Sequence, residues 1–333
     1  MGYYQLFKYG SGVLYGPQAV VHSVDPLEGP APGGNRFVIL GEGFDPRQWD
    51  DYFTGAVLDP LKWTDASTGS GSITVGADHL QMSTGTTPAS IAGVQSVKQW
   101  GDTQGEVRMS LSAPTANPSS NVALFALNLF VDSSNFAAMV VYLSDEGNLR
   151  LECGVYVGGS PVDLLKIELP WTTGLSMFKI LRWGTDVYFI ANGSVVMRSV
   201  RYIVNPAHFV IYSFNGSASY DVDVARVEWF YYRPFAVFQN QPVHDTVVVS
   251  DKRVRGLVPA SRDDAWQSAA YEGEVDVSVV GNDKATSRDS YRYYYVDGLR
   301  SINSAQSGVE MDIVNDTQLV TPSDASKGLG GGY

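Results

Sequence analysis

The sequence predicts an all-β protein built from antiparallel sandwiches. Short apolar or alternating segments end in Gly, Asn, Asp, Ser or Pro, and helical periodicity is nearly absent. The chain of 333 residues contains 34 Gly, 16 Pro, 19 Tyr, 14 Phe and 7 Trp, a composition rich in turn and strand formers. The expected strands lie within segments 36–44, 72–82, 105–113, 122–131, 136–144, 149–157, 178–197, 209–214, 222–232, 245–251 and 273–281.

One of these segments has an unambiguous turn. Asn192-Gly193 separates two apolar runs, Asp186–Ile190 and Ser194–Arg198. Asn and Gly both tolerate the positive φ angles that a two-residue hairpin turn requires. We therefore expect a β-hairpin at this point.

Composition excludes several classes of function. The chain has 23 Lys and Arg against 35 Asp and Glu, a net charge of −12, which disfavours binding to nucleic acid and to anionic membranes. No apolar stretch is long enough to span a bilayer, and the N-terminus lacks a secretory signal, so we expect assembly in a cytoplasm. The single cysteine, Cys153, excludes an internal disulfide and lies in an apolar run, which predicts a buried thiol.

Two distant segments resemble one immunoglobulin-like domain. The first holds Val24-Asp25-Pro26, Gly33-Gly34 and Gly41-Glu42-Gly43-Phe44, in the order typical of the opening of an IPT/TIG domain. Residues 237–297 resemble the closing strands of the same family, with a Val-Pro-Ala segment and a final aromatic strand. The resemblance implies a discontinuous IPT/TIG domain of residues 17–45 plus 237–297. A surface loop of such a domain can receive a second domain.

The inserted segment, residues 46–236, resembles a concanavalin A-like jelly roll of the laminin-G and glucanase type. It opens with Asp51-Tyr52-Phe53-Thr54-Gly55 and Leu58-Asp59-Pro60-Leu61-Lys62-Trp63, and it closes with an aromatic strand that ends at Tyr232. Trp63 and Trp229 occupy positions that are in the core in this family. The resemblance implies a two-sheet sandwich.

The chain ends are predicted to be flexible arms. Residues 1–16 form an aromatic-glycine arm that resembles short stretches in virion proteins of tailed bacteriophages, and residues 298–333 form a flexible or docking tail. Aromatic side chains provide much contact area, so the candidate assembly contacts are those of the first arm. They are Tyr3, Tyr4, Phe7, Tyr9 and Tyr15.

No catalytic residue is predicted. Retaining glucanases need two carboxylates about 5–5.5 Å apart. Glu272-Gly-Glu274-Val-Asp276 lies in the immunoglobulin-like part, and Asp221, Asp223 and Glu228 do not all share one strand face. The sequence also lacks a nucleophile elbow and a phosphate loop. We therefore expect a non-enzymatic protein.

Cofactors are not expected. His22, His79, His208 and His244 show no zinc-ligand spacing. Asp132-Ser133-Ser134-Asn135 is a candidate set of Ca²⁺ donors, although a hairpin turn is the simpler interpretation.

Glycan binding is the ligand chemistry that the aromatic residues allow, because sugars place their apolar faces on exposed rings. The candidate glycan contacts are Trp100, Tyr142, Trp171 and Trp183. Core packing is the alternative interpretation of each.

The sequence thus predicts a virion structural protein of a tailed bacteriophage, located on the tail or decorating the head. It would be assembled in the host cytoplasm beside other virion proteins, as a homo-oligomer or symmetric array, and would display a sandwich that contacts host-surface glycans for attachment. Two alternatives remain open. One is a glucanase-like depolymerase, and the other is a cell-surface or secreted carbohydrate-binding adhesin.

Overall fold

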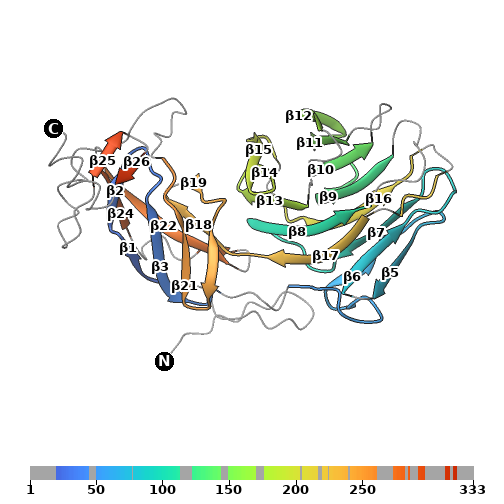
Figure 1. The fold of residues 1–333 in the computed structure, drawn as a ribbon, viewed down its shortest axis with the longest axis horizontal. Coiled ribbons are helices and arrows are strands. Elements are labelled where there is room, and N and C mark those ends of the chain that lie inside the picture. Colours follow the sequence, from blue (N-terminus) through green and yellow to red (C-terminus); the bar gives the residue numbers. More distant parts are fainter. Residues whose placement is uncertain are drawn as a thin grey trace. The chain divides into compact units, whose positions relative to one another are not determined.

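The computed structural model of this chain is all-β, and its described residues contain no helix (Figure 1). None of them therefore forms a helix that could cross a membrane. The structure describes residues 20–44, 50–76, 78–112, 122–143, 149–169, 176–202, 205–216, 220–223, 225–238, 241–260, 273–281, 284–285, 292–296, 312–315 and 318–320. The chain divides into two compact units, Met1–Asp45 with Pro234–Tyr333 and Pro46–Arg233.

The unit Pro46–Arg233 is a jelly roll of two seven-stranded antiparallel sheets. The first sheet has the order β12-β11-β10-β9-β16-β7-β4, and the second has the order β15-β14-β13-β8-β17-β6-β5. The strands of the first sheet are β4 (Trp63–Asp65), β7 (Ile91–Ser96), β9 (Ala123–Asp132), β10 (Asn135–Leu143), β11 (Leu149–Val157), β12 (Ser160–Leu169) and β16 (His208–Phe214). Those of the second are β5 (Ser72–Gly76), β6 (His79–Ser83), β8 (Thr103–Leu111), β13 (Met177–Trp183), β14 (Asp186–Ala191), β15 (Ser194–Ser199) and β17 (Ala225–Tyr232).

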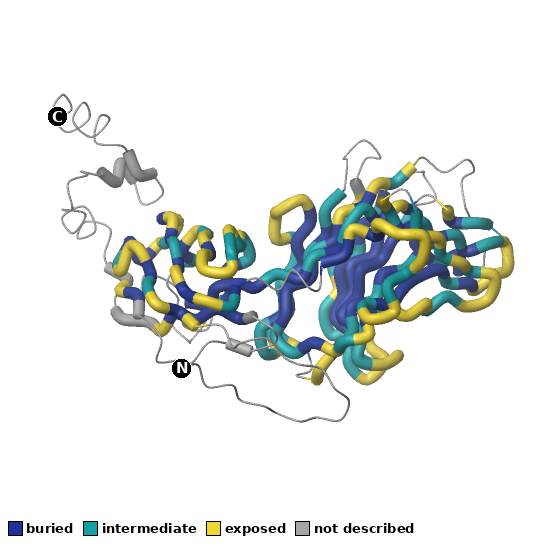
Figure 2. The backbone as a smooth tube through the Cα atoms, turned by 90° about the horizontal axis from the view of Figure 1, so that it is seen from below, coloured by how far each residue is buried: buried dark blue, intermediate teal, exposed yellow. Residues whose placement is uncertain are grey.

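The core of the jelly roll lies between these sheets. Strand β16 shows why the sequence folds this way, because its residues alternate between half-buried and buried along the whole strand. Phe209 and Ile211 point inward and join a single apolar cluster with residues such as Phe125, Phe178 and Phe189. Buried segments run through the middle of this unit, and exposed ones lie at its edges (Figure 2).

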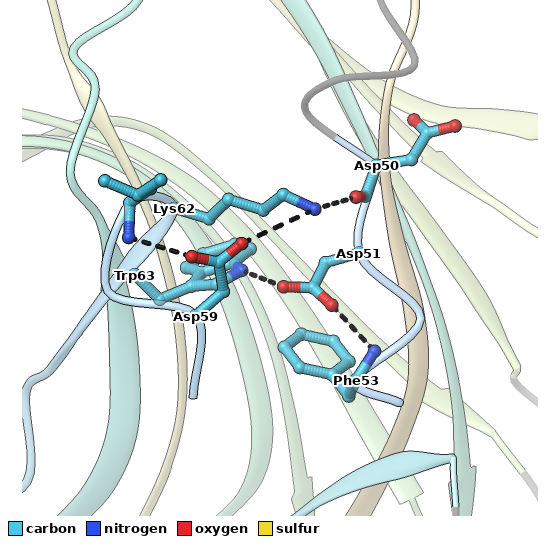
Figure 3. Close-up of polar contacts among 7 residues, drawn as sticks. Asp50, Asp51, Phe53, Asp59, Lys62 and Trp63 are labelled. Atoms are coloured by element: carbon cyan, nitrogen blue, oxygen red, sulfur yellow. Dashed lines mark hydrogen bonds and ion pairs between the residues drawn. The ribbon is translucent and has the colours of Figure 1, made fainter. Parts of the chain in front are cut away.

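The opening segment of the jelly roll is anchored by buried polar contacts (Figure 3). Asp51 accepts hydrogen bonds from Trp63 Nε1 at 2.9 Å and from the Phe53 backbone N–H at 2.7 Å. Its backbone pairs with Phe230 of the closing strand, and the Trp63 ring meets that phenylalanine edge-on at 5.0 Å. Lys62 Nζ donates to the Asp50 carbonyl and lies 4.0 Å from Asp59. The backbone pairing and the ring contact with Phe230 therefore hold the two ends of the domain together, and Asp51 fixes the Trp63 ring that makes the second of them.

The hairpin at Asn192-Gly193 is confirmed. It joins β14 and β15, with φ angles of 48° and 83° at the two turn residues. Trp63 and Cys153 are buried, as the sequence indicates, with 3% and 1% of their surfaces exposed.

The prediction that Trp229 lies in the core is wrong. A β-bulge shifts the pairing of β17 with β8 between Val227 and Trp229. One extra residue moves the following side chains to the opposite face. Trp229 consequently lies outside the core, stacked on Tyr231 with ring centroids 3.9 Å apart.

The other unit contains two sheets formed by strands from both of its chain segments. The four-stranded sheet has the order β1-β3-β21-β20, and the second has the order β19-β18-β22-β24-β2 with β23 paired to β22. These strands are β1 (Val20–Asp25), β2 (Glu28–Pro30), β3 (Arg36–Glu42), β18 (Phe235–Phe238), β19 (Gln241–Pro242), β20 (Val247–Ser250), β21 (Arg253–Leu257), β22 (Gly273–Gly281), β23 (Lys284–Ala285) and β24 (Arg292–Val296). A separate hairpin pairs β25 (Asp312–Asn315) with β26 (Gln318–Val320).

Its core combines residues far apart in sequence. Phe37, from the first segment, packs against Phe238, and Phe238 meets Tyr293 edge-on. Tyr293 also exchanges hydrogen bonds with Asn35 across 258 positions of the chain. The two segments therefore form one folded unit.

Candidate glycan groove on the jelly roll

The outer face of the first sheet carries a second apolar cluster, separate from the core. Ala123, Ala126, Ala138 and Val140 are buried there. They are covered by rings that stay half-buried, those of Phe136, Tyr142, Tyr212 and Phe214. An outer sheet face normally carries polar side chains, so a floor of small residues beneath aromatic rings is a specific arrangement.

Glycines make room for these rings. A Cβ at Gly93 would lie 2.6 Å from Tyr212 Cβ, and one at Gly154 would lie 2.9 Å from the ring of Tyr156. Tyr156 in turn stacks on Phe136, with ring centroids 4.4 Å apart and planes 16° from parallel. The rings thus extend from β16 across to β11 over a floor without bulky side chains.

A groove of about 350 Å³ opens among these residues. Its lining comes from the residue after β4 and from β7, β9, β10, the β9–β10 turn and β16, and all of its members are uncharged. They are Ala66, Ile91, Gln95, Asn128, Phe130, Ser133, Phe136, Val210, Tyr212 and Phe214.

Asn128 is the polar centre of the groove. It lies on β9, opposite Ala138 of β10 and Val210 of β16, and only 5% of its surface is exposed. Its Nδ2 donates to the Tyr212 hydroxyl at 3.4 Å, but its Oδ1 has no hydrogen-bond partner among the described residues. An unsatisfied buried acceptor costs about 1–3 kcal/mol, so the site is poised to accept a hydrogen bond from a ligand.

Tyrosines of this face are held in their neutral form. Burial raises the pKa of Tyr212, against the smaller opposite effect of the hydrogen bond from Asn128. Burial also raises the pKa of Tyr142 and of Tyr156, and the negative charge of Glu152 adds to both shifts. All three hydroxyls therefore remain both donors and acceptors at neutral pH.

Glu152 is a carboxylate of the same outer face, on β11. Its side chain is only 12% exposed and lies 3.0 Å from Lys166 Nζ on the neighbouring strand. The Tyr156 hydroxyl donates to it across 3.5 Å.

The candidate glycan contacts predicted from sequence do not form one site. Tyr142 lies on this outer face, where the Arg150 guanidinium sits 5.1 Å from its ring centroid. Trp100 is 1% exposed and stacks on Tyr232 inside the core, so it offers no face to a sugar. Trp183 is half-buried on β13 of the other sheet, and Trp171 lies outside the described residues.

Other predicted groups have structural partners. Asp132 closes the β9–β10 turn by accepting hydrogen bonds from Ser134 N and Asn135 Nδ2, and the Asn135 bond is the main reason that its pKa is lowered. Asn135 Oδ1 accepts from Gly158 N. These bonds form a hairpin turn, and Ca²⁺ binding by this set stays a prediction. The assembly contacts Tyr3, Tyr4, Phe7, Tyr9 and Tyr15 lie outside the described residues.

The carboxylates in and just before the closing strand β17 also have partners. Asp221 accepts hydrogen bonds from Ser83 Oγ at 2.9 Å and from Gly85 N at 2.8 Å. Glu228 forms an ion pair with Arg108 at 2.9 Å. These contacts serve the fold of the sandwich.

The residues that sequence reasoning missed are Asn128, Phe130, Phe136, Tyr212 and Phe214. The available signal was Asn128 itself, the one polar residue in the run from Val122 to Val131. A polar residue inside a continuous apolar strand is a candidate for a ligand contact or a buried hydrogen bond.

Comparison with known proteins finds solved structures that resemble part of the chain. No family model and no curated protein sequence matches the chain. Solved structures share the jelly-roll fold, among them a β-glucanase of Bacillus licheniformis, with 12% identity, 55% of this chain and 96% of that chain covered and a TM-score of 0.42. Another is the catalytic domain of an endo-1,3-β-glucanase (laminarinase) from Thermotoga petrophila, with 11% identity, coverages of 55% and 95% and a TM-score of 0.43.

A third similar structure is the Crh5 transglycosylase, with 13% identity, coverages of 64% and 84% and a TM-score of 0.40. All three are described as enzymes that act on carbohydrates or transfer glycosyl groups. This finding contradicts the prediction that the chain is not an enzyme. At these identities the likeness is one of fold.

Proposed function

We propose that the jelly roll binds a neutral glycan chain in the groove on the outer face of its first sheet. The observation that carries the proposal is the Oδ1 of Asn128, which is buried among aromatic rings and has no hydrogen-bond partner in the described part of the chain. A sugar hydroxyl is a donor that can reach such an acceptor, and the C–H face of the same sugar packs on aromatic rings. Because the lining is uncharged, the favoured glycan is neutral.

The groove offers each part of a sugar ring a partner. Phe130, Phe136 and Tyr212 supply apolar faces, and Gln95 and Ser133 supply polar side chains. The strands beneath pair from β10 through β9 and β16 to β7, with an irregularity between Tyr212 and Phe214. A site on paired strands needs little ordering when ligand binds, which favours affinity.

Affinity electrophoresis of the full chain tests this proposal. The gels would contain β-1,3-glucan, β-1,3-1,4-glucan or mucin O-glycans, and wild type would be compared with Asn128→Leu. We expect at least one neutral glycan to retard the wild type and to lose most of that effect on Asn128→Leu. Equal mobility of both proteins in every gel would reject the proposal.

Cleavage of the bound glycan is the second candidate, and Glu152 is the residue that favours it. Most glycosidases use two carboxylates, but some pair a tyrosine nucleophile with other groups. The Tyr156 hydroxyl donates to Glu152 beside Phe136 of the groove. Reducing-end release from a retained glycan, abolished in Glu152→Gln while retardation persists, would support cleavage. Release that persists in Glu152→Gln would remove Glu152 from this role.

We also propose that residues 17–45 with residues 237–297 form an IPT/TIG immunoglobulin-like domain that carries the jelly roll on a virus particle. Two observations support the immunoglobulin-like domain: its described strands form two sheets, and they come from both sides of the inserted domain. Immunogold labelling of purified phage particles with antibody against residues 46–236 tests the location. Label on heads or tails is expected, and protein found only free in the supernatant would reject it.

A further inference from the structure

A second groove lies on the four-stranded sheet of the other unit and is chemically unlike the first. It has a volume of about 420 Å³, and three arginines line it, Arg36 on β3 with Arg253 and Arg255 on β21. All three are exposed, and none forms an ion pair with a described carboxylate. In a chain with a net charge of −12, such a cluster is a local reversal of charge.

The remaining lining is aliphatic rather than aromatic. Val38, Val247 and Leu257 line the groove, and Phe37 is the one ring among its residues, itself buried in the core. Val247 and Leu257 are 46% and 44% exposed. Asp245 is the single acidic residue in the lining, and its Oδ1 accepts a hydrogen bond from the Leu257 backbone. Without an exposed ring, the groove lacks the feature that favours a sugar.

Strand geometry fixes the spacing of the arginines. Arg253 and Arg255 are two residues apart on one strand, so their side chains leave the same face about 7 Å apart. Arg255 pairs with Val38 and Leu257 pairs with Arg36, which places Arg36 diagonally from Arg255 on the neighbouring strand. The three positive charges therefore follow the repeat of an extended polypeptide, whose alternate side chains have the same separation.

We propose that this groove binds an extended acidic peptide segment of a partner protein, with Asp or Glu at alternate positions and aliphatic residues between them. The carboxylates pair with Arg36, Arg253 and Arg255, which can each hold a carboxylate through two parallel hydrogen bonds. The aliphatic side chains of the peptide contact Val38, Val247 and Leu257. The inference is independent of glycan binding, because the two grooves belong to different units.

Fluorescence anisotropy with the full chain tests the inference. The probe is a labelled decapeptide of alternating Glu and Val, and the reference is an otherwise identical peptide with Ser in place of Glu. We expect the Glu-Val peptide to bind at least about tenfold more tightly, and the triple variant R36E/R253E/R255E to weaken it by at least about tenfold.

Two further variants distinguish loss of binding in the groove from a general effect of charge and from misfolding. Lys252→Glu changes an exposed charge in the turn beside β21, outside the groove lining, and should alter the affinity less than about twofold. The triple variant R36K/R253K/R255K keeps the charge but loses the second parallel hydrogen bond at each position, so it should weaken binding by about two- to fivefold, less than the charge reversal does.

Three results would overturn the inference. One is equal binding of the Glu-Val and Ser-Val peptides. The second is a loss in Lys252→Glu as large as in the triple reversal. The third is tighter binding of polygalacturonate than of the Glu-Val peptide, lost in R36E/R253E/R255E, which would assign the groove to an anionic polysaccharide.

Discussion

The two sheets of the jelly roll present opposite chemistry on their outer faces. The sheet containing β8, β13 and β17 carries ion pairs between strands, Arg108–Glu228 at 2.9 Å, Lys179–Glu106 at 3.2 Å and Arg198–Asp186 at 2.5 Å. The sheet containing β9, β10 and β16 carries small residues, aromatic rings and an unpaired amide oxygen. Each sheet leaves one buried side-chain amide without a full set of partners among the described residues, Asn128 on the first sheet and Gln104 on the second, so the two faces differ in charge and in accessible aromatic surface.

Removing a ring from each face gives the largest expected contrast. Phe136→Ala should raise the glycan dissociation constant by about 30-fold, because a central aromatic contact contributes about 2 kcal/mol. Tyr188→Ala removes a half-buried ring from the other sheet and should leave the affinity unchanged within about twofold. Isothermal titration calorimetry measures both. Equal losses would show that the two faces do not differ in function.

Removing a polar group from each face should change the free energy of unfolding in opposite directions. Asn128→Leu removes an unpaired buried acceptor and should raise the free energy of unfolding by about 1 kcal/mol while abolishing glycan binding. Glu106→Gln breaks the ion pair with Lys179, in which the Lys179 and Glu106 side chains are 14% and 13% exposed. This change should lower the free energy of unfolding by about 1–2 kcal/mol. Urea unfolding of both variants measures the difference. A destabilised Asn128→Leu would mean that Oδ1 is already satisfied.

Alkaline pH should lower the free energy of unfolding through the buried tyrosines on the outer face of the first sheet. Burial raises the pKa of Tyr142 and Tyr212 above the ordinary value of 10.0. A raised folded-state pKa contributes stability that is complete below about pH 10 and is lost as pH rises through the folded value. Unfolding free energies should thus be constant from about pH 8 to 9.5 and fall above pH 10. Tyr212→Phe should reduce that fall, and an unchanged pH profile in this variant would contradict the assignment.

Salt should change the binding affinities least, and it should affect the two grooves differently. Because the lining of the glycan groove is uncharged, raising NaCl from about 0.05 to 0.5 M should change glycan affinity less than about twofold. Binding of the Glu-Val peptide to the arginine groove should weaken several-fold over the same range. Anisotropy titrations at three salt concentrations make this comparison. A strong salt dependence of glycan binding would point to charged contacts outside the groove.

Much of the fold could be predicted because strand periodicity and turn chemistry are local. The hairpin at Asn192-Gly193, the burial of Trp63 and the buried Cys153, whose pKa is raised by burial to about 12, all follow from short stretches of sequence. Trp229 could not be placed correctly, because its face depends on a bulge that only the pairing of β17 with β8 reveals. One inserted residue reverses every later side chain of a strand.

The candidate site was less accessible to sequence reasoning. In the run from Val122 to Val131 both faces of the strand are apolar, so alternation does not tell Phe125, which is in the core, from Phe130, which lines the groove. Large aromatic side chains are good candidates for sugar contacts, but Trp100 is buried in the core. What creates the groove is the combination of Gly93 and Ala138 on different strands, and this depends on sheet register.

Glycan binding at the outer face of the first sheet is best tested by NMR, with a titration of the full chain by a neutral glycan that it retains. The resonances to follow are those of the Asn128 side-chain amide and of the second sheet. We expect large shifts at Asn128 and at neighbours of Phe136 and Tyr212, and none near the Lys179–Glu106 pair. Saturable binding that leaves the Asn128 amide unmoved and shifts the second sheet would contradict it.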